Sequence, residues 1–133
     1  MFFFKLIMSA HIALYRLTGG RLGGKNIVLL TTIGKKSGQP RTKPLFHIKD
    51  GNSYIVIASA GGSEKNPAWY GNLTANPKVT VEDHGRTIAG VAATTSPEER
   101  ARLWTQIVAK NPGFGGYEQR TSRVIPVVRI QPA

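Results

Sequence analysis

Short apolar segments joined in pairs by two- or three-residue turns constrain the fold of this chain more than any other feature. Two such pairs occur, Lys43–Lys49 with Ser53–Ser59 around Asp50-Gly51-Asn52, and Lys78–Asp83 with Arg86–Ala92 around His84-Gly85. Turns this short join antiparallel neighbours, whereas parallel strands need a crossover of a dozen or more residues. The β-branched runs Ile27–Ile33 and Val124–Ile130 add two further strands. We therefore predict a mainly β, α+β fold in which about six antiparallel strands close into a small barrel with flanking helices.

Local capping signals predict two internal helices. Asn66 before Pro67 is typical of an N-cap followed by proline at the first helical position, so a short helix is expected to run to about Ala75. The sequence Ser96-Pro97-Glu98-Glu99 has the form of a capping box and predicts a longer helix that ends near Asn111. Neither helix lies between two strands of a parallel βαβ unit, which again favours the antiparallel barrel.

The first 18 residues form a separate, strongly apolar segment. As a helix, this segment places Lys5, Ser9 and Arg16 on one narrow face and aromatic and aliphatic side chains on the remaining face. It is too short and too interrupted by charge to span a bilayer, and it lacks the arrangement of a secretory signal. We therefore predict an amphipathic helix over residues 1–18 and a barrel domain over residues 22–133, joined by a glycine-rich hinge. Two interpretations of the helix stay open: it lies on a membrane surface or a partner, or it covers the protein's own core.

The charge distribution indicates an anionic partner. The chain has 18 Lys and Arg against 7 Asp and Glu, and nine of the basic residues precede the first acidic one, Asp50. Such a basic half attracts nucleic acid, anionic lipid or a phosphorylated cofactor. The basic residues lie in glycine- and proline-containing loops and no known nucleic-acid-binding motif is present, so we expect no nucleic-acid partner. Cysteine is absent and the three histidines lack metal-ligand spacing, which argues against a disulfide, a cysteine nucleophile or a metal centre.

Two glycine-rich basic loops, Gly34–Arg41 and Ser59–Pro67, are the candidate anion site. Glycine lets the backbone approach a ligand, and Lys, Arg and exposed N–H groups bind phosphate. The order of residues in the first loop is not that of a Walker A motif. The second loop leads into the predicted short helix, whose first N–H groups favour an anion. The alternative is a pair of solvated surface hairpins, and Trp69 and Tyr70 either wall a flat ring or pack in the core.

A third glycine-rich segment, Asn111–Tyr117, carries two aromatic residues and is expected to be a flexible loop. Next to a cofactor it would form a lid over a planar substrate, and otherwise it is an ordinary connection between a helix and a strand. No Ser-His-Asp arrangement is recognisable, and paired carboxylates occur only at Glu82-Asp83 and Glu98-Glu99. A chain with few acid–base groups and a large anion site fits an enzyme whose cofactor supplies the chemistry.

Three blocks of sequence resemble the deazaflavin-dependent nitroreductase family: LLTTIGKKSGQPRTKPL, then DGNSYIVIASAGGSEKNPAWYGNLTANPKV, and the terminal SRVIPVV. The resemblance covers about residues 22–131. It implies a split, flavin-reductase-like β-barrel and an oxidoreductase that transfers a hydride from the reduced deazaflavin coenzyme F-420 to a planar acceptor, such as a quinone, an enone or a nitro compound. Members of this family are found mainly in actinobacteria.

The resemblance also implies roles for individual residues. Lys36, Ser37 and Arg41 would bind the cofactor phosphate, and Ala58–Gly62 would lie beside the deazaflavin ring. Carried over by motif, the full set of cofactor-binding positions is Lys36, Ser37, Gln39, Arg41, Thr42, Pro44, Ala58, Ser59, Ala60, Gly61, Gly62, Lys65, Asn66, Trp69 and Asn76. Ser59 and Tyr117 would act at the substrate, under a lid formed by Asn111, Phe114 and Tyr117. Only one tyrosine remains in that lid, so we expect quinone or enone reduction and weak or absent nitroimidazole reduction.

Three alternatives stay open at this point. The nearest is a flavin (FMN) enzyme or a haem-degrading protein with the same barrel. The second is a non-catalytic protein that binds and stores the deazaflavin. The third is a basic protein that binds a membrane surface or nucleic acid. For the favoured interpretation we expect a cytoplasmic protein, peripheral on the inner face of the membrane if residues 1–18 bind lipid, and a homodimer if the barrel pairs as split barrels often do.

Overall fold

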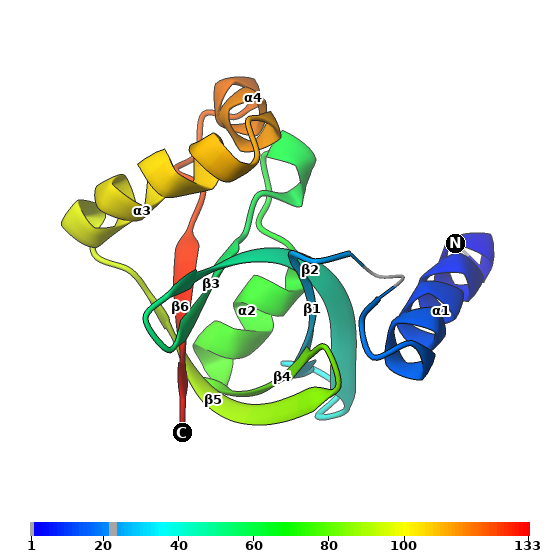
Figure 1. Ribbon diagram of the computed structural model, residues 1–133. Coiled ribbons are helices and arrows are strands. Elements are labelled where there is room, and N and C mark those ends of the chain that lie inside the picture. The colour runs from blue at the N-terminus through cyan, green and yellow to red at the C-terminus, as the bar shows by residue number, and fades with distance from the viewer. Residues whose placement is uncertain (1, 22–23) are drawn as a thin grey trace.

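In a computed structural model, residues 2–21 and 24–133 are described, with the side chains of residues 2–9 left out of the description. Four α-helices, one 3₁₀ helix (η1) and six strands follow one another along the chain (Figure 1). Their order is α1 (Phe2–Leu17), β1 (Ile27–Ile33), β2 (Pro40–Asp50), β3 (Ser53–Ile57), η1 (Ala60–Gly62), α2 (Ala68–Ala75), β4 (Lys78–Asp83), β5 (Arg86–Thr94), α3 (Pro97–Lys110), α4 (Gly113–Arg120) and β6 (Val127–Pro132).

The six strands close a barrel in the order β1-β2-β3-β6-β5-β4, and every neighbouring pair is antiparallel (Figure 1). The two predicted hairpins are present as β2–β3 and β4–β5. At the second turn His84 and Gly85 both have positive φ, 51° and 88°, as the tightest hairpin turns require. The predicted closed antiparallel barrel is therefore confirmed.

Strand β3 is buried along its whole length because both of its faces are covered. Tyr54 and Val56 point into the barrel, where they pack with Trp69 and Leu73 of α2, the helix seen inside the ring of strands in Figure 1. The alternate residues of β3 belong to a second, outer core. That core is formed by Ile48, Ile55, Ile57, Leu103, Ile107, Phe114, Ile125 and Val127, so α3 and α4 cover the outside of β2, β3 and β6.

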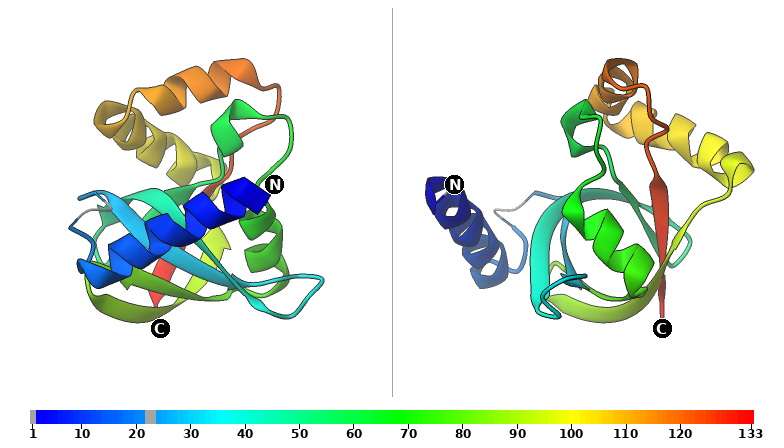
Figure 2. Two further views of the ribbon diagram at one scale, coloured as in Figure 1. Left: turned by 90° about the vertical axis from the view of Figure 1, so that its right-hand side faces the viewer. Right: turned by 180° about the vertical axis from the view of Figure 1, so that it is seen from behind.

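Helix α1 lies outside the barrel wall and contacts it near its C-terminal end (Figure 2). Tyr15 is 1% exposed, and its hydroxyl donates to Ile27 O (2.9 Å) and accepts from His84 N (3.0 Å). Arg16 forms a two-pronged pair with the Glu82 carboxylate (2.9 and 2.8 Å). On the same stretch of helix, Leu17 is 83% exposed. Among the described residues, no helix is long and apolar enough to cross a membrane.

Several predicted boundaries were wrong. Strand β2 begins at Pro40 rather than Lys43, because its first residues continue the ladder with β1; a hydrogen bond between the Thr31 and Thr42 hydroxyls (2.7 Å) supports this extension. Strand β6 spans Val127–Pro132 rather than Val124–Ile130, since its ends are set by pairing with β3 and β5.

The N-cap of α2 is Pro67 and not Asn66, whose side chain bonds elsewhere. Half of the predicted capping box of α3 is present: Ser96 Oγ accepts a hydrogen bond from Glu99 N at 3.2 Å. The Glu99 carboxylate, however, accepts a hydrogen bond from Arg129 (2.8 Å), a residue that is adjacent only in the folded barrel.

Candidate functional site

The first glycine-rich loop connects β1 to β2 and is closed by its own backbone. Gly34 N donates to Gln39 O and Gly38 N donates to Gly34 O, each at 2.8 Å. Gly38 adopts a φ of 70°, which a side chain would strain, and a Cβ on Gly34 would collide with Ser37 Oγ. The Ser37 hydroxyl accepts from Gln39 N (3.2 Å) and from Arg41 Nη2 (3.3 Å), so the loop brings Ser37 and Arg41 together.

The side chains expected to bind phosphate are open to solvent on this loop. Lys36, Ser37, Gln39 and Arg41 are all exposed. Thr42 and Pro44, predicted to line the same groove, are half-buried positions further along β2. The structure thus places Lys36, Ser37 and Gln39 on the loop, Arg41 at the start of β2 and the other predicted groove residues further along that strand.

Asn72 on α2 anchors this loop, and sequence reasoning missed it. Its Oδ1 accepts a hydrogen bond from Lys35 N at 2.9 Å, and its Nδ2 donates to the buried Thr32 Oγ1 at 3.2 Å. Asn72 is 8% exposed. The signal that could have found it is helical spacing: Asn72 lies three residues after Trp69 and next to Leu73, on the buried side of α2.

Asn76, the asparagine selected from sequence, lies just after α2 instead. Its Oδ1 accepts from Lys78 N at 3.2 Å, which helps to end the helix and begin β4. Among the contacts of the described residues, Asn76 has none to the first loop, whereas Asn72 has one. Asn72 is therefore the asparagine of this segment that shapes the candidate site.

The second loop leaves β3 and forms η1 before it reaches α2. Ser59 is buried at the end of the strand, and the next three residues all have positive φ: 48° at Ala60, 66° at Gly61 and 83° at Gly62. A Cβ on Gly62 would lie 2.9 Å from Tyr117 O, so glycine is required where η1 meets α4. The predicted ring-side backbone, residues 58–62, is thus a tightly curved segment packed against α4.

Lys65 and Asn66 follow η1 on the exposed part of the loop. Lys65 O accepts from Ser63 Oγ (2.8 Å), and Asn66 Oδ1 accepts from Arg123 Nη1 (2.7 Å). Arg123 is a second residue that sequence reasoning missed. Because α2 begins where this loop ends and also holds the first loop through Asn72, α2 connects the two glycine-rich loops.

Trp69 packs in the core of the barrel rather than on an open surface. It is 7% exposed, its ring meets Tyr70 edge-on at 6.5 Å, and it belongs to the cluster that fills the barrel. Of the two interpretations of this residue, core packing is the one that the structure describes.

The segment Asn111–Tyr117 is not a flexible glycine-rich loop. Asn111 caps the end of α3 and its Oδ1 accepts from Gly113 N (3.2 Å), and α4 starts immediately afterwards. Phe114 is buried against Phe46 (5.3 Å between ring centroids) and meets Tyr117 edge-on (5.6 Å). Aromatic packing at i, i+3 spacing overrides the low helix propensity of three glycines. The backbone of Tyr117 lies against η1 and its half-buried side chain packs on the outer core, so the predicted lid is a docked helix.

Most of the acidic side chains have partners away from the first loop, which leaves the cations of that loop for a ligand. Arg102 and Arg129 lower the pKa of Asp50 to about 2 through hydrogen bonds to its carboxylate. The other ion pairs are Arg16–Glu82, His84–Asp83, Arg100–Glu118 and Arg129–Glu99. Within the described part of the chain, no ion pair involves Lys36, Arg41 or Lys65.

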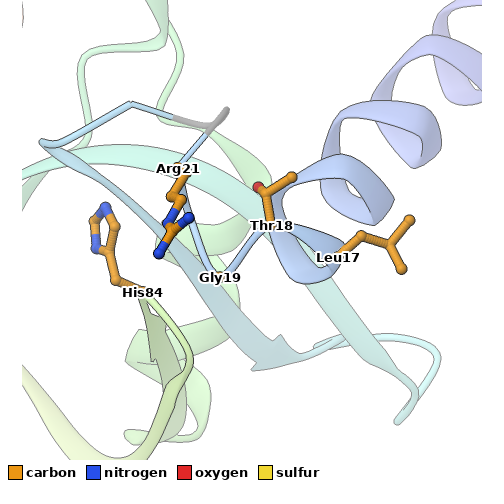
Figure 3. A pocket seen from close by; sticks show the side chains of 5 residues that line it. All are labelled: Leu17, Thr18, Gly19, Arg21 and His84. Atoms are coloured by element: carbon orange, nitrogen blue, oxygen red, sulfur yellow. The ribbon is translucent and has the colours of Figure 1, made fainter.

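A hollow of about 650 Å³ lies elsewhere, between the end of α1 and the β4–β5 turn (Figure 3). It is lined by Leu17, Thr18, Gly19, Arg21 and His84, none of which belongs to the predicted site. The two ring nitrogens of His84 lie 2.7 Å from Asp83 Oδ1 and 3.1 Å from Gly24 O, so this imidazole ties the chain after α1 to the turn.

The closed antiparallel barrel, its outer helices and its cationic glycine-rich loop define a split-barrel protein, and solved structures share this arrangement. A structure described as a domain-swapped dimer is 33% identical, covers 96% of this chain and 98% of its own, and has a TM-score of 0.77. An F420-H2 dependent reductase, FDR-A, is 38% identical over 80% of this chain and 95% of its own, with a TM-score of 0.75.

Sequence comparison identifies the family. The family model described as F420H(2)-dependent quinone reductase, where F420H(2) is reduced F-420, matches residues 8–132. An F420H(2)-dependent quinone reductase of Mycobacterium tuberculosis is 40% identical over 131 residues, covering 92% of this chain and 87% of that protein. The chain therefore belongs to the F420H(2)-dependent quinone reductase family. This membership confirms the expected enzyme class, an oxidoreductase with reduced F-420 as its cofactor.

Proposed function

We propose that this protein reduces a quinone with a hydride taken from reduced F-420 and that the first glycine-rich loop binds the cofactor phosphate. The observation that carries this proposal is the loop itself. Backbone hydrogen bonds of its glycines close the loop, and the side chains of Lys36, Ser37 and Arg41 lie near one another on it. Asn72 fastens the loop backbone to α2. Charged donors without acidic partners are suited to a phosphate, because binding it disrupts no ion pair that the fold needs. The residues present therefore fit the cofactor.

The bound deazaflavin supplies the hydride, and the chain supplies position and a dry surface. Gly61 and Gly62 allow the backbone after β3 to approach a flat ring closely. Ser59, at the end of β3, lies at the inner edge of this segment, and Lys65 adds positive charge at its outer edge. With Gln39 at the end of the first loop and Thr42 and Pro44 on β2, these residues make up the proposed groove.

We assign the acceptor side of the site to α4. The Tyr117 hydroxyl would donate a proton to the oxygen of the reduced quinone, and Phe114 would keep the helix docked while this happens. Asn111 acts only through the turn that starts α4. A hydrogen-bond donor at the acceptor oxygen stabilises the charge that develops there. Only one tyrosine is available in this segment, which favours quinones and enones over nitroimidazoles.

The first experiment is a titration of the full chain with oxidised F-420, with FMN as the parallel control. Binding of F-420 alone, followed by quinone reduction in the presence of F-420H2, supports the proposal and excludes a storage protein. Binding of FMN alone would keep the fold and change the cofactor. If neither ligand bound, the two loops would be surface hairpins, and the basic face would be tested on anionic vesicles and random DNA.

We further propose that α1 brings the protein to the inner face of the cell membrane, where quinones reside. Leu14 (49% exposed) and Leu17 (83% exposed) are open to solvent on α1, and the exposed Arg21 follows the helix, so this segment carries both apolar and basic groups suited to anionic lipid. Flotation with anionic vesicles should decrease for the full-length variant Leu14→Glu/Leu17→Glu. Val124→Glu is the matched control, since Val124 is 74% exposed on the far segment before β6. Equal flotation of all three proteins would contradict membrane binding by α1.

A homodimer is proposed on narrower grounds. One solved relative is described as a domain-swapped dimer, and α1 of this chain lies outside the barrel wall and is fastened to it by Tyr15, as an exchangeable element could be. Light scattering during size exclusion at several protein concentrations tests this directly. A mass of 14.4 kDa at every concentration would rule the dimer out.

A further inference from the structure

The oxygen atoms of the second glycine-rich loop converge on one guanidinium group. Arg123, in the segment between α4 and β6, donates from Nε to Ser63 O (2.8 Å) and from Nη1 to Asn66 Oδ1 (2.7 Å). Its Nη2 donates to Ala58 O (3.1 Å) and Ser59 O (2.8 Å). One side chain therefore spans the loop from the end of β3 almost to the start of α2.

The residue before Arg123 makes a second contact with the same loop. Ser122 donates from its backbone N (3.2 Å) and its hydroxyl (2.9 Å) to the carboxylate of Glu64. These hydrogen bonds lower the pKa of Glu64, so the carboxylate is charged at neutral pH. Ser122 and Arg123 together act as a brace that fastens loop 58–66 to the segment following α4.

The loop conformation needs such a brace. Ala60 has a φ of 48°, a left-handed conformation that is strained for a residue with a side chain. The local hydrogen bonds, Gly62 N to Ser59 O (2.9 Å) and Ser63 N to Ala60 O (3.2 Å), hold only one short turn. With several carbonyl oxygens directed at Arg123, its hydrogen bonds offset the strain.

We propose that Arg123 is a positioning residue for hydride transfer: it sets the conformation of loop 58–66 and its distance from α4. The inference rests on the function proposed above, in which this loop lines the ring and α4 carries the proton donor. Arg123 sits on the segment that follows α4 and bonds the loop on the other side, so it couples the two halves of the site. In this proposal the cofactor phosphate is bound by the first loop, and Arg123 does not take part in phosphate binding.

The chemistry of the contact requires arginine. A guanidinium offers five N–H donors in a rigid plane, and Arg123 uses three nitrogens to reach four oxygens. Lysine keeps the positive charge but presents its donors from a single nitrogen. Arg123→Lys therefore removes the brace while retaining the charge.

Arg100 provides a matched control. It also donates to the segment between α4 and β6, from Nε to Ile125 O (2.8 Å), and it stacks on Trp104 (4.5 Å to the ring centroid). Among the contacts of the described residues, it has none to loop 58–66. Arg100→Lys should lower thermal stability without changing the geometry of the ring-side loop.

Three measurements on the full chain test the proposal. In the absence of cofactor, amide hydrogen exchange at Gly62 and Ser63 should be faster in Arg123→Lys and unchanged in Arg100→Lys. In steady state, kcat for quinone reduction per folded molecule should fall by roughly tenfold or more in Arg123→Lys, because small misplacements of reacting groups cost this much. The dissociation constant for oxidised F-420 should change much less than kcat, because the first loop is intact.

Unchanged amide exchange at Gly62 and Ser63 in Arg123→Lys would contradict the claim that Arg123 orders loop 58–66. Faster exchange with a kcat close to that of the wild type would overturn the positioning role. If the wild type itself neither bound F-420 nor reduced quinone, the proposed function would fail and the catalytic part of the inference with it. The exchange data, which need no cofactor, would still decide whether Arg123 orders the loop.

Discussion

Replacing Asn72 with alanine tests the link between the barrel core and the candidate phosphate loop. The amide of Asn72 makes two hydrogen bonds, one to Lys35 N (2.9 Å) and one to Thr32 Oγ1 (3.2 Å), and Thr32 is completely buried. In Asn72→Ala both partners stay in place and lose their hydrogen bond, which costs more than the net value of the two bonds. We expect a loss of about 2–3 kcal/mol in the free energy of unfolding.

For a domain of this length, that loss corresponds to a decrease of roughly 7–10 °C in Tm. The same variant should weaken F-420 binding, because Lys35 opens the loop that carries Lys36, Ser37 and Arg41. Thr74→Ala is the control on the same helix: Thr74 is exposed, and its hydroxyl donates to Gly71 O (2.9 Å) within the helix. This change should alter stability by no more than about 0.5 kcal/mol.

The assays are thermal unfolding by circular dichroism and titration with oxidised F-420. A decrease in Tm of less than about 2 °C for Asn72→Ala would refute the magnitude argued from the two hydrogen bonds. A large decrease in Tm with unchanged F-420 affinity, measured well below the transition, would show that Asn72 stabilises the barrel without shaping the loop.

Three further substitutions test other parts of the argument. Arg41→Ala should raise the dissociation constant for F-420 by roughly ten- to a hundredfold, the range for a lost hydrogen bond to a charged group, and an unchanged constant would remove Arg41 from the phosphate site. Tyr117→Phe should lower quinone turnover and leave F-420 affinity intact, and equal turnover would exclude Tyr117 as the proton donor. Burial lowers the pKa of His47, whose Nδ1 donates to Asn26 O (2.9 Å), so the native state resists protonation of this ring. The unfolded chain takes up that proton as pH falls through about 6.5, and stability therefore decreases below that pH. His47→Gln should flatten the decrease in urea-unfolding free energy between pH 7 and 5, and an equally steep decrease would assign it to other groups.

Asp83 titrates in a different range and can be separated from His47. Burial by itself would raise the pKa of this carboxyl, but hydrogen bonds from His84 (2.7 Å) and Tyr54 (2.7 Å) together lower it. A lowered pKa means that stability is present near neutral pH and is lost only below about pH 4, as the carboxylate is protonated.

Much of the barrel could be predicted because the signals that specify its hairpins lie in short contiguous stretches of sequence. Each hairpin is specified by a turn such as His84-Gly85 and by the alternation of apolar residues on either side. The misjudged strand boundaries depend on how far each strand pairs with its neighbours in the barrel. The local sequence of Pro40–Thr42 predicts a loop, but pairing with β1 makes these residues part of a strand. The local sequence of Val124–Pro126 predicts a strand, but β3 and β5 pair with β6 only from Val127 onward. Helix α4 was missed for a related reason, since its glycines disfavour a helix and its packing partner Phe46 lies far away in sequence.

The candidate site divides in the same way. By itself the sequence determined the cationic glycine-rich loops, the strands that precede them and the resemblance to a deazaflavin family, because these are properties of contiguous residues. Only the tertiary structure decided which side chains order the loops. Asn72 and Lys35 are 37 residues apart, and Arg123 and Ser59 are 64 apart. Such contacts exist only once the barrel has closed and the outer helices have docked, since no local pattern encodes which loop a distant side chain will meet.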